Sequence, residues 1–95
     1  MKSKYLKNVM AGIAFLNVVN PKWVKKIDLK KLDLSSTNTC VIGEVFGNYH
    51  DGINKMDLDS SQAETLGFYL QEDNDYGLLT KTWKSVIQKI KRKKV

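Results

Sequence analysis

Apolar residues recur at every third or fourth position near both ends of this 95-residue chain, which is the spacing of one face of an α-helix. The first stripe consists of Leu6, Val9, Met10, Ile13 and Leu16. The second consists of Tyr76, Leu79, Trp83, Val86, Ile87 and Ile90. We therefore predict a long helix over residues 3–20 and another over residues 76–93, both packed around shorter helices between them.

Local signals set the ends of the first helix and predict a short second one. Ser3 is suited to cap the first helix, and Asn20 is disfavoured in helical geometry because it precedes proline. A second helix over residues 21–26 can open on that proline. After it, Asp28 can cap a single helical turn over residues 29–32, with extended chain as the alternative.

The centre of the chain predicts a third helix, which begins in the capping residues 35–38 and runs to about Tyr49. Gly43 and Gly47 lie inside it, and a glycine in a helix interior costs about 1 kcal/mol relative to alanine. We therefore expect another backbone segment to approach both glycines closely. Gly52 suits the left-handed position after a helix and is expected to end this one.

A fourth helix is predicted to begin among the capping residues 59–61. Ser61 and Glu64 have the spacing of a capping box, in which each side chain binds a backbone amide of the other. Gly67 is expected to end this helix, and Phe68 is then placed to pack back on its last turn. The few residues that follow are expected to be extended, before an acidic loop leads into the last helix.

These elements favour an all-α fold, a small bundle of four to five helices in a single domain over residues 1–95. A minor two-stranded β element remains an alternative near Phe68. The predicted core draws on every helix and contains both tryptophans: Leu6, Val9, Ile13, Leu16, Trp23, Ile27, Leu32, Val41, Ile42, Val45, Phe46, Leu66, Phe68, Leu79, Trp83, Val86, Ile87 and Ile90.

The sequence also predicts the compartment. No apolar run approaches the roughly 20 residues that span a bilayer. Lysines precede an uncharged stretch over residues 8–20, as in a signal peptide, but its apolar residues fall on one helical face and Trp23 continues the pattern. Cys40 is the single cysteine, which excludes an internal disulfide and fits a reducing compartment. We therefore expect a cytoplasmic protein.

Charge is segregated along the chain. Residues 1–31 carry eight lysines and one carboxylate, a net charge of +7. Residues 32–75 carry nine carboxylates and one lysine, a net charge of −8, and residues 76–95 carry seven basic residues and no acid. Arg92 is the only arginine among 16 basic residues, whereas proteins that read base sequence favour arginine. An ordinary solvated surface is the simplest interpretation, with two functional alternatives.

The first alternative is a basic surface that binds the phosphates of DNA or RNA. It would combine the N-terminal Lys2, Lys4 and Lys7 with the C-terminal Lys89, Lys91, Arg92, Lys93 and Lys94. The second alternative is an acidic surface that docks on a basic region of another protein. Its candidate residues are Asp57, Asp59, Glu64, Glu72, Asp73 and Asp75.

Reactive side chains are few, and no nucleophile or phosphate-loop motif is present. Cys40 and His50 are the types that form a thiolate–imidazole pair, but ten residues along one helix span about 15 Å, so they cannot touch on the predicted third helix. With Asp51 they include zinc-ligand types, yet they lack the usual paired spacing, which makes a metal site a weak alternative. We expect no enzymatic activity and no cofactor.

The sequence pattern around the predicted third helix is distinctive. Residues 40–49 read Cys-Val-Ile-Gly-Glu-Val-Phe-Gly-Asn-Tyr. Trp23, Ile27-Asp28 and Leu32-Asp33 precede this segment, and Gly67-Phe68, Leu79-Thr80 and Trp83 follow it. Over about residues 22–85 the pattern resembles a group of small proteins encoded by phages and prophages, in which the segment reads Cys-Val-Leu-Gly-Gln-Val-Phe-Gly-x-Tyr. Glu44 stands where that group has glutamine.

The resemblance implies a biological context. No activity is assigned to the group, so no functional residue carries over to this chain. Small phage accessory proteins without catalytic motifs often inhibit host proteins, and anti-CRISPR proteins are one such class. The leading expectation is therefore a phage-type inhibitor that binds a host or defence protein in the host cytoplasm, through the acidic middle or the lysine-rich last helix. A small DNA- or RNA-binding regulator and a structural accessory domain are the alternatives.

Overall fold

The computed structural model describes residues 3–71 and 75–93, and all regular elements in these residues are helices. In chain order they are α1 (Leu6–Val19), the 3-10 helix η1 (Trp23–Lys26), α2 (Val41–Phe46), α3 (Tyr49–Met56), α4 (Ser60–Thr65) and α5 (Tyr76–Lys93). The expected all-α class is confirmed, and the described residues contain no strand, so the minor β element is not found there. Within these residues no helix is long and apolar enough to cross a membrane.

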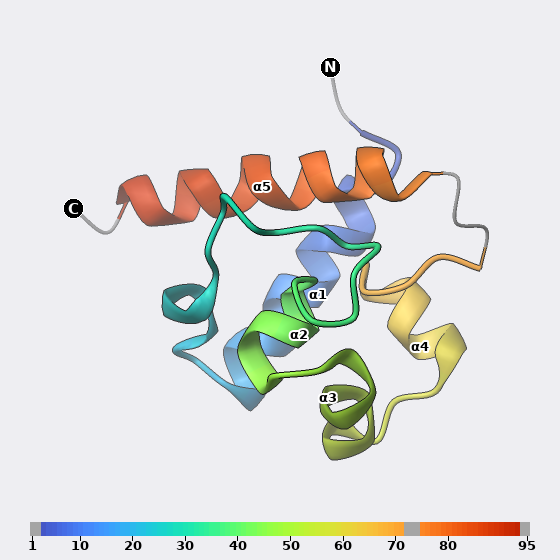
Figure 1. Cartoon of the computed structure of the whole chain (residues 1–95). Coiled ribbons are helices and arrows are strands. Elements are labelled where there is room, and N and C mark those ends of the chain that lie inside the picture. The colour runs from blue at the N-terminus through green and yellow to red at the C-terminus, as the bar shows by residue number, and fades with distance from the viewer. Residues whose placement is uncertain (1–2, 72–74, 94–95) are drawn as a thin grey trace.

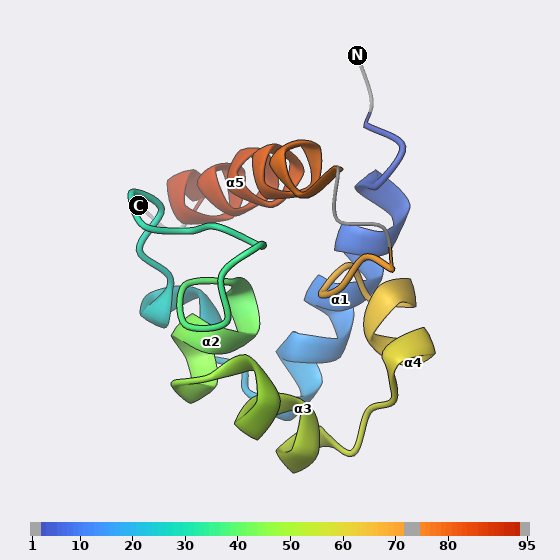
Figure 2. The same ribbon diagram turned by 45° about the vertical axis from the view of Figure 1, so that its right-hand side comes forward.

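The two long helices cross, and the short ones fill the space beside them. Figure 1 shows α5 along one side of the molecule and α3 on the opposite side, with α1 crossing behind α5. Figure 2 shows α1 between α5 and α4. The limits of α5 agree with the prediction, whereas α1 begins at Leu6, because Ser3 accepts a hydrogen bond from the amide of Tyr5 at 3.0 Å in a turn before the helix.

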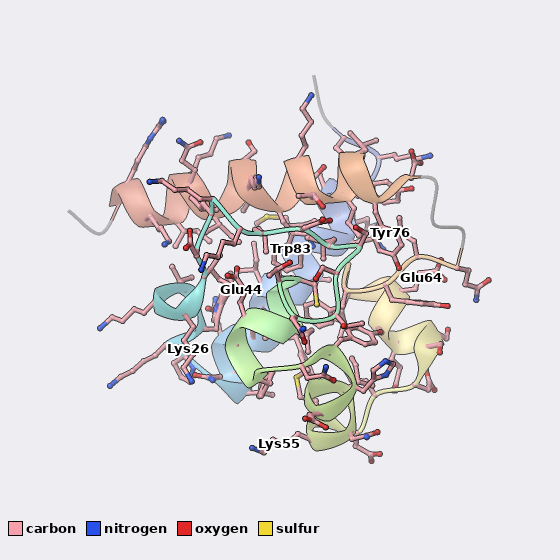
Figure 3. All side chains as sticks on the ribbon, in the orientation of Figure 1. Lys26, Glu44, Lys55, Glu64, Tyr76 and Trp83 are labelled. Atoms are coloured by element: carbon pink, nitrogen blue, oxygen red, sulfur yellow. The ribbon has the colours of Figure 1, made fainter. Side chains whose placement is uncertain are left out.

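Two tryptophans form the centre of the core. Trp23 and Trp83 are fully buried and pack edge to face, with ring centroids 6.2 Å apart, and Phe68 stacks on Trp83 at 5.8 Å. Each indole N–H has a partner, because Trp23 donates to the side chain of Asn17 at 2.8 Å and Trp83 donates to the carbonyl of Gly67 at 2.7 Å. Figure 3 labels Trp83 in the interior of the molecule.

Most of the predicted core is buried. The buried members are Val9, Ile13, Leu16, Trp23, Ile27, Leu32, Val41, Ile42, Val45, Phe68, Leu79, Trp83 and Ile87. Four predicted residues pack against the core but are partly exposed, namely Phe46, Leu66, Val86 and Ile90, and Leu6 is also partly exposed. Core residues that the prediction omitted are Val24, Leu34, Cys40, Ala63 and Leu70.

The single third helix predicted up to Tyr49 is wrong, because the chain breaks after α2. Gly47 has a φ of 95°, in the region that favours glycine, and it ends α2. Asn48 then caps α3, accepting hydrogen bonds from the amides of His50 at 2.9 Å and Asp51 at 3.4 Å. Residues 35–38 form turns before α2.

The glycines of this region have different roles from those predicted. A side chain on Gly43 would lie 2.6 Å from the carbonyl oxygen of Thr37, so the expected close approach is confirmed there. At Gly47 no atom of the described residues beyond its chain neighbours lies within 4 Å of such a position, and glycine is needed for the backbone angle instead. Gly52 does not end a helix, since it lies within α3 and a side chain there would overlap Ile42.

The two ends of α4 follow local capping rules. The capping box of α4 joins Asp59 and Gln62, rather than Ser61 and Glu64, with hydrogen bonds of 2.7 and 2.9 Å. Gly67 follows the helix with a φ of 75°, and the chain turns back on α4, as predicted, since the amide of the buried Phe68 donates to the carbonyl of Ala63 at 2.9 Å.

The segment between η1 and α2 forms a turn rather than extended chain. The carbonyl of Asp28 accepts hydrogen bonds from the amides of Lys31 and Leu32, both at 3.0 Å, and its side chain accepts one from Lys30 at 2.9 Å. Asp28 therefore caps a single turn, as predicted. The 3-10 helix before it starts at Trp23, which is later than the predicted start at residue 21.

Candidate functional site

Cys40 caps a helix inside the core. Its sulfur accepts a hydrogen bond from the amide of Gly43 at 3.2 Å and lies 4.0 Å from the carbonyl oxygen of Thr37. The residue is 2% exposed, and burial raises the pKa of the Cys40 thiol. The thiol is therefore neutral near pH 7, which opposes its use as a nucleophile.

Cys40 and His50 line one pocket, although the sequence placed them far apart on a common helix. The pocket has a volume of about 170 Å³, and its wall also includes Tyr49, Phe68 and Tyr76. The break at Gly47 brings the start of α3 back toward the start of α2, because the amide of Tyr49 donates to the carbonyl of Thr37 at 2.8 Å. Among the hydrogen bonds of the described residues, none joins Cys40 to His50.

The weak metal-site hypothesis receives no support from this arrangement. Across residues 3–71 and 75–93, no group of three or more histidine, cysteine, aspartate and glutamate side chains gathers within reach of one ion. Asp51 is exposed in the first turn of α3, whereas Cys40 is buried. The three predicted ligands, Cys40, His50 and Asp51, are therefore not assembled as a set.

Several residues of the predicted acidic surface have structural roles. Asp57 ends α3 with a left-handed φ of 56°, and Asp59 caps α4. Asp75 forms an ion pair with Lys4 at 2.7 Å and accepts a hydrogen bond from Tyr5 at 2.7 Å, and these contacts lower the pKa of Asp75.

The structure describes only part of the remaining acidic candidates. Glu64 lies on α4, where Figure 3 labels it on the opposite side of the molecule from Lys26. Glu72 and Asp73 lie outside the described residues. Of the six predicted residues, four are described by the structure, and three of these, Asp57, Asp59 and Glu64, form no ion pair with another described residue.

The predicted basic patch divides between the two ends of α5. Lys4 binds Asp75, just before the first residue of α5, whereas Lys91 and Arg92 lie in its last turn. The 18 residues of α5 span about 27 Å, so Lys4 lies far from Lys91 and Arg92, whereas Lys89 lines a hollow together with Ser3 and Leu6. Lys93 lies at the end of α5, and Lys94 and Lys2 lie outside the described residues.

The end of α5 instead contacts Ile27, the residue that follows η1. The ammonium group of Lys91 donates to the carbonyl of Ile27 at 2.9 Å. Glu44 lies beside this contact and accepts hydrogen bonds from the amide of Asp28 at 3.2 and 3.3 Å. Burial raises the pKa of Glu44, and the positive charges of Lys31 and Lys91 partly oppose that shift.

This contact creates a basic surface that the sequence did not predict. We call it the basic end, and it consists of the exposed Lys25, Lys26, Lys30, Lys31 and Arg92. Figure 3 shows Lys26 pointing outward on this side of the molecule. The lysine pairs at 25–26 and 30–31 were visible in the sequence, but only the folded path of the chain places them beside the last turn of α5.

A second surface is apolar and lies between the long helices. It is a groove of about 550 Å³ lined by Leu6, Met10, Ile13, Asn17, Pro21, Val24, Val86, Lys89 and Ile90. A neighbouring hollow of about 520 Å³ shares Leu6, Val86 and Lys89, and it adds Ser3, Leu78, Lys81, Thr82 and Ser85. We call the two together the α1–α5 groove.

The lining of the α1–α5 groove is mostly apolar, and its charged residues are all lysines. Met10 is 50% exposed and Leu78 is 38% exposed, so both apolar side chains are accessible at the groove. The charged residues in its lining are Lys81 and Lys89, and none of the lining residues is acidic. Sequence reasoning placed Leu6, Val86 and Ile90 in the core, because a helical stripe does not reveal how much of its width the neighbouring elements cover.

Comparison with known proteins adds no relative. No protein-family model matches the sequence, and comparisons with curated proteins and with solved structures found no match. The surfaces described above are therefore the basis for inferring what the protein does.

Proposed function

We propose that this protein acts by binding another protein, as an inhibitor that covers part of the surface of a host or defence protein. The observation that carries this proposal is the α1–α5 groove. Exposed, contiguous apolar surface with a polar rim is typical of sites that bind proteins or ligands. In this groove, Met10 and Leu78 are exposed and Lys81 and Lys89 lie in the lining.

The lining of the groove favours a protein partner over a nucleic acid. Leucine, isoleucine, valine and methionine side chains gain free energy by leaving water, at about 25 cal/mol per Å² of apolar area. They offer no hydrogen bonds to phosphate, which dominates affinity for nucleic acids. Met10 is flexible and polarisable, and methionine adapts well to the shape of a protein partner.

A binding role also agrees with the state of the reactive side chains. Burial raises the pKa of the Cys40 thiol, and it raises the pKa of Tyr49 to about 12, so both groups keep their protons near neutral pH. An inhibitor that works by covering a surface needs no reactive group. The resemblance of residues 22–85 to small phage proteins supports the same class, with anti-CRISPR proteins as its sharpest example.

Site-specific photo-crosslinking in host cells tests the proposal. A benzophenone amino acid placed at Met10 lies at the α1–α5 groove, and the same group placed at Val18 is a matched control. Val18 is also on α1 and is 80% exposed, but it does not line the groove. We expect the probe at Met10 to capture a discrete protein that the probe at Val18 does not capture. Equal capture from both positions, or none from either, would refute protein binding through this groove.

Nucleic-acid binding through the basic end is a second candidate function. The contact between Lys91 and Ile27 favours it, because this contact places the end of α5 beside the lysines of residues 25–31. Lysine contacts to phosphate must appear first at low salt, and the dependence of affinity on salt falls as contacts are removed.

The test compares two sets of lysine-to-glutamine variants. One neutralises Lys25, Lys26, Lys30 and Lys31, and the other neutralises Lys7, Lys55, Lys81 and Lys84, which lie on other elements. If the basic end binds phosphate, only the first set should abolish binding of a fluorescent duplex DNA or single-stranded RNA at low salt. No binding by the wild-type protein at low salt would exclude this function.

A further inference from the structure

We propose that the occupant of the α1–α5 groove is an amphipathic helix of the partner protein, with acidic residues beside its apolar face. This inference rests on the proposed protein-binding function and adds the chemistry of the partner. Three properties of the groove carry it, namely its shape, its length and its charge.

The shape of the groove suits a rounded, apolar rod. Residues from three directions line it, because Met10 and Ile13 come from α1, Val86 comes from α5, and Pro21 and Val24 come from the turn after α1 and from η1. Walls from three directions make a hollow rather than a flat face. Proteins commonly bind the apolar face of a partner helix in such a hollow, through side chains spaced three, four and seven residues apart.

The length of the groove corresponds to a few helical turns. Along α5 the lining extends from Leu78 to Ile90, and a helix advances about 18 Å over that distance. A bound helix of about three to four turns would therefore cover the groove from end to end. Helices of this length are ordinary in globular proteins and in segments that fold on binding.

The charge of the lining selects acidic residues on that helix. Lys81 and Lys89 are exposed, and they lie about two turns, or about 12 Å, apart along α5. Carboxylates spaced two turns apart on a partner helix could meet both ammonium groups. Charge complementarity of this kind orients a partner and excludes partners of the wrong charge.

The same features disfavour other occupants. A second copy of this chain would bring Lys81 and Lys89 against an equally basic surface, because a symmetric dimer joins the same patch of both copies. An anionic membrane would match the lysines and the exposed Met10 and Leu78, but a flat lipid surface would leave the hollow unfilled, since Ile13 in its lining is 7% exposed.

Designed peptides test the inference directly. The probes are three fluorescein-labelled peptides of about 16 residues, long enough for roughly four helical turns. The first carries leucines at helical spacing with glutamates beside them, the second replaces glutamate with lysine, and the third has the composition of the first in scrambled order. We expect fluorescence anisotropy to show that the first peptide binds at least about tenfold more tightly than the other two.

Variants then locate the site. Met10→Glu should weaken binding of the acidic peptide by about tenfold or more, because it places a carboxylate in the apolar lining. Val18→Glu adds the same charge to an exposed position on α1 outside the groove and should leave affinity unchanged. Leu78→Glu provides a second groove variant at a 38% exposed position, so a folding defect in one variant does not leave the test undecided.

Each alternative has a distinct result that would overturn the inference. Equal binding of all three peptides would remove the selectivity for an acidic helix. Adsorption to phosphatidylserine vesicles that Met10→Glu abolishes would indicate a membrane. A dimer in sedimentation equilibrium that Met10→Glu dissociates would indicate a second copy. If the peptides fail while crosslinking from Met10 still captures a discrete protein, the partner chemistry is wrong and the proposed protein binding stands.

Discussion

The sulfur of Cys40 lies under the first turn of α2, where it accepts a hydrogen bond from the amide of Gly43. A side chain in that position satisfies a backbone amide that the helix itself leaves without a partner. Because the same burial raises the pKa of the thiol, capping and nucleophilic reactivity are opposed at this residue. The reactivity of the Cys40 thiol distinguishes a capping role from a nucleophilic one.

Thiol reactivity gives that measurement. In the native protein Cys40 is 2% exposed, so a disulfide reagent can reach it only through local opening or unfolding. We expect its reaction at neutral pH to be at least about a hundredfold slower than in the urea-unfolded chain. A fast native reaction with an apparent pKa below about 8 would show an accessible thiolate and would contradict the proposed non-catalytic role.

Tyr49 predicts how stability responds to alkaline pH. Burial raises the pKa of Tyr49 in the folded protein to about 12, whereas a tyrosine in an unfolded chain ionises at about pH 10. Between these values the unfolded state binds fewer protons, so the free energy of unfolding should fall with rising pH, by at most about 1.4 kcal/mol per pH unit from this group.

Urea denaturation at a series of pH values checks this expectation. Tyr49→Phe removes the ionisable hydroxyl, so its free energy of unfolding should fall less steeply than that of the wild-type protein above about pH 10. Between about pH 6 and pH 9 the difference between the two proteins should stay constant, because neither state loses the Tyr49 proton there. Parallel curves over the whole range would contradict the assignment.

At the scale of single elements, replacing a helical glycine with alanine has two opposing effects, because it raises helix propensity but adds a Cβ atom that needs space. Alanine at Gly43 would gain helix propensity, but its side chain would lie 2.6 Å from the carbonyl oxygen of Thr37. The overlap involves backbone and should outweigh the propensity gain of about 1 kcal/mol. We expect Gly43→Ala to destabilise the protein by about 1–3 kcal/mol, measured by urea denaturation.

Gly77 supplies the matched control for that substitution. It lies in the first turn of α5, and among the described residues none outside its own chain neighbours and helix comes within 4 Å of an added Cβ. Gly77→Ala should therefore stabilise the protein by about 0.5–1 kcal/mol. Similar effects of the two substitutions would mean that the close approach at Gly43 does not constrain the fold.

The elements differ in how well the sequence predicts them, and the reason is local. The apolar stripe of α5 follows acidic residues and ends among lysines in the sequence, so periodicity together with these flanking charges gave its limits. Through Val45, Phe46 and Tyr49 the apolar spacing continues across the break between α2 and α3, and periodicity therefore predicted one helix. The pair Gly47-Asn48 was the contrary signal, since glycine ends helices and asparagine caps them.

At the scale of the whole molecule, the sequence predicts charge segregation but not which charged segments meet. The N-terminal and C-terminal lysines appeared to be one patch, yet α5 holds them apart and brings Lys91 to Ile27 instead. Likewise, the exposure of Met10 depends on what lies opposite it. The basic end and the α1–α5 groove both depend on the path of residues 20–40. These residues connect α1 with α2 and have little periodic pattern of their own.

The basic end should make stability depend on salt. It contains five exposed cationic residues, namely Lys25, Lys26, Lys30, Lys31 and Arg92, with the exposed Asp28 between them in sequence, in a chain of net charge +6. Repulsion between like charges opposes the folded state, and salt weakens it as the Debye length falls from about 30 Å at 0.01 M to about 10 Å at 0.1 M. The free energy of unfolding should therefore rise with salt over this range.

Neutralising the basic end separates this effect from the general action of salt on proteins. With glutamine at all four lysines of residues 25–31, the salt-dependent rise should be smaller than in the wild-type protein. The variant with glutamine at Lys7, Lys55, Lys81 and Lys84 has the same net charge but retains the basic end, so its rise should stay closer to that of the wild type. Equal slopes in the two variants would mean that net charge, rather than the gathering of lysines against the end of α5, sets the response to salt.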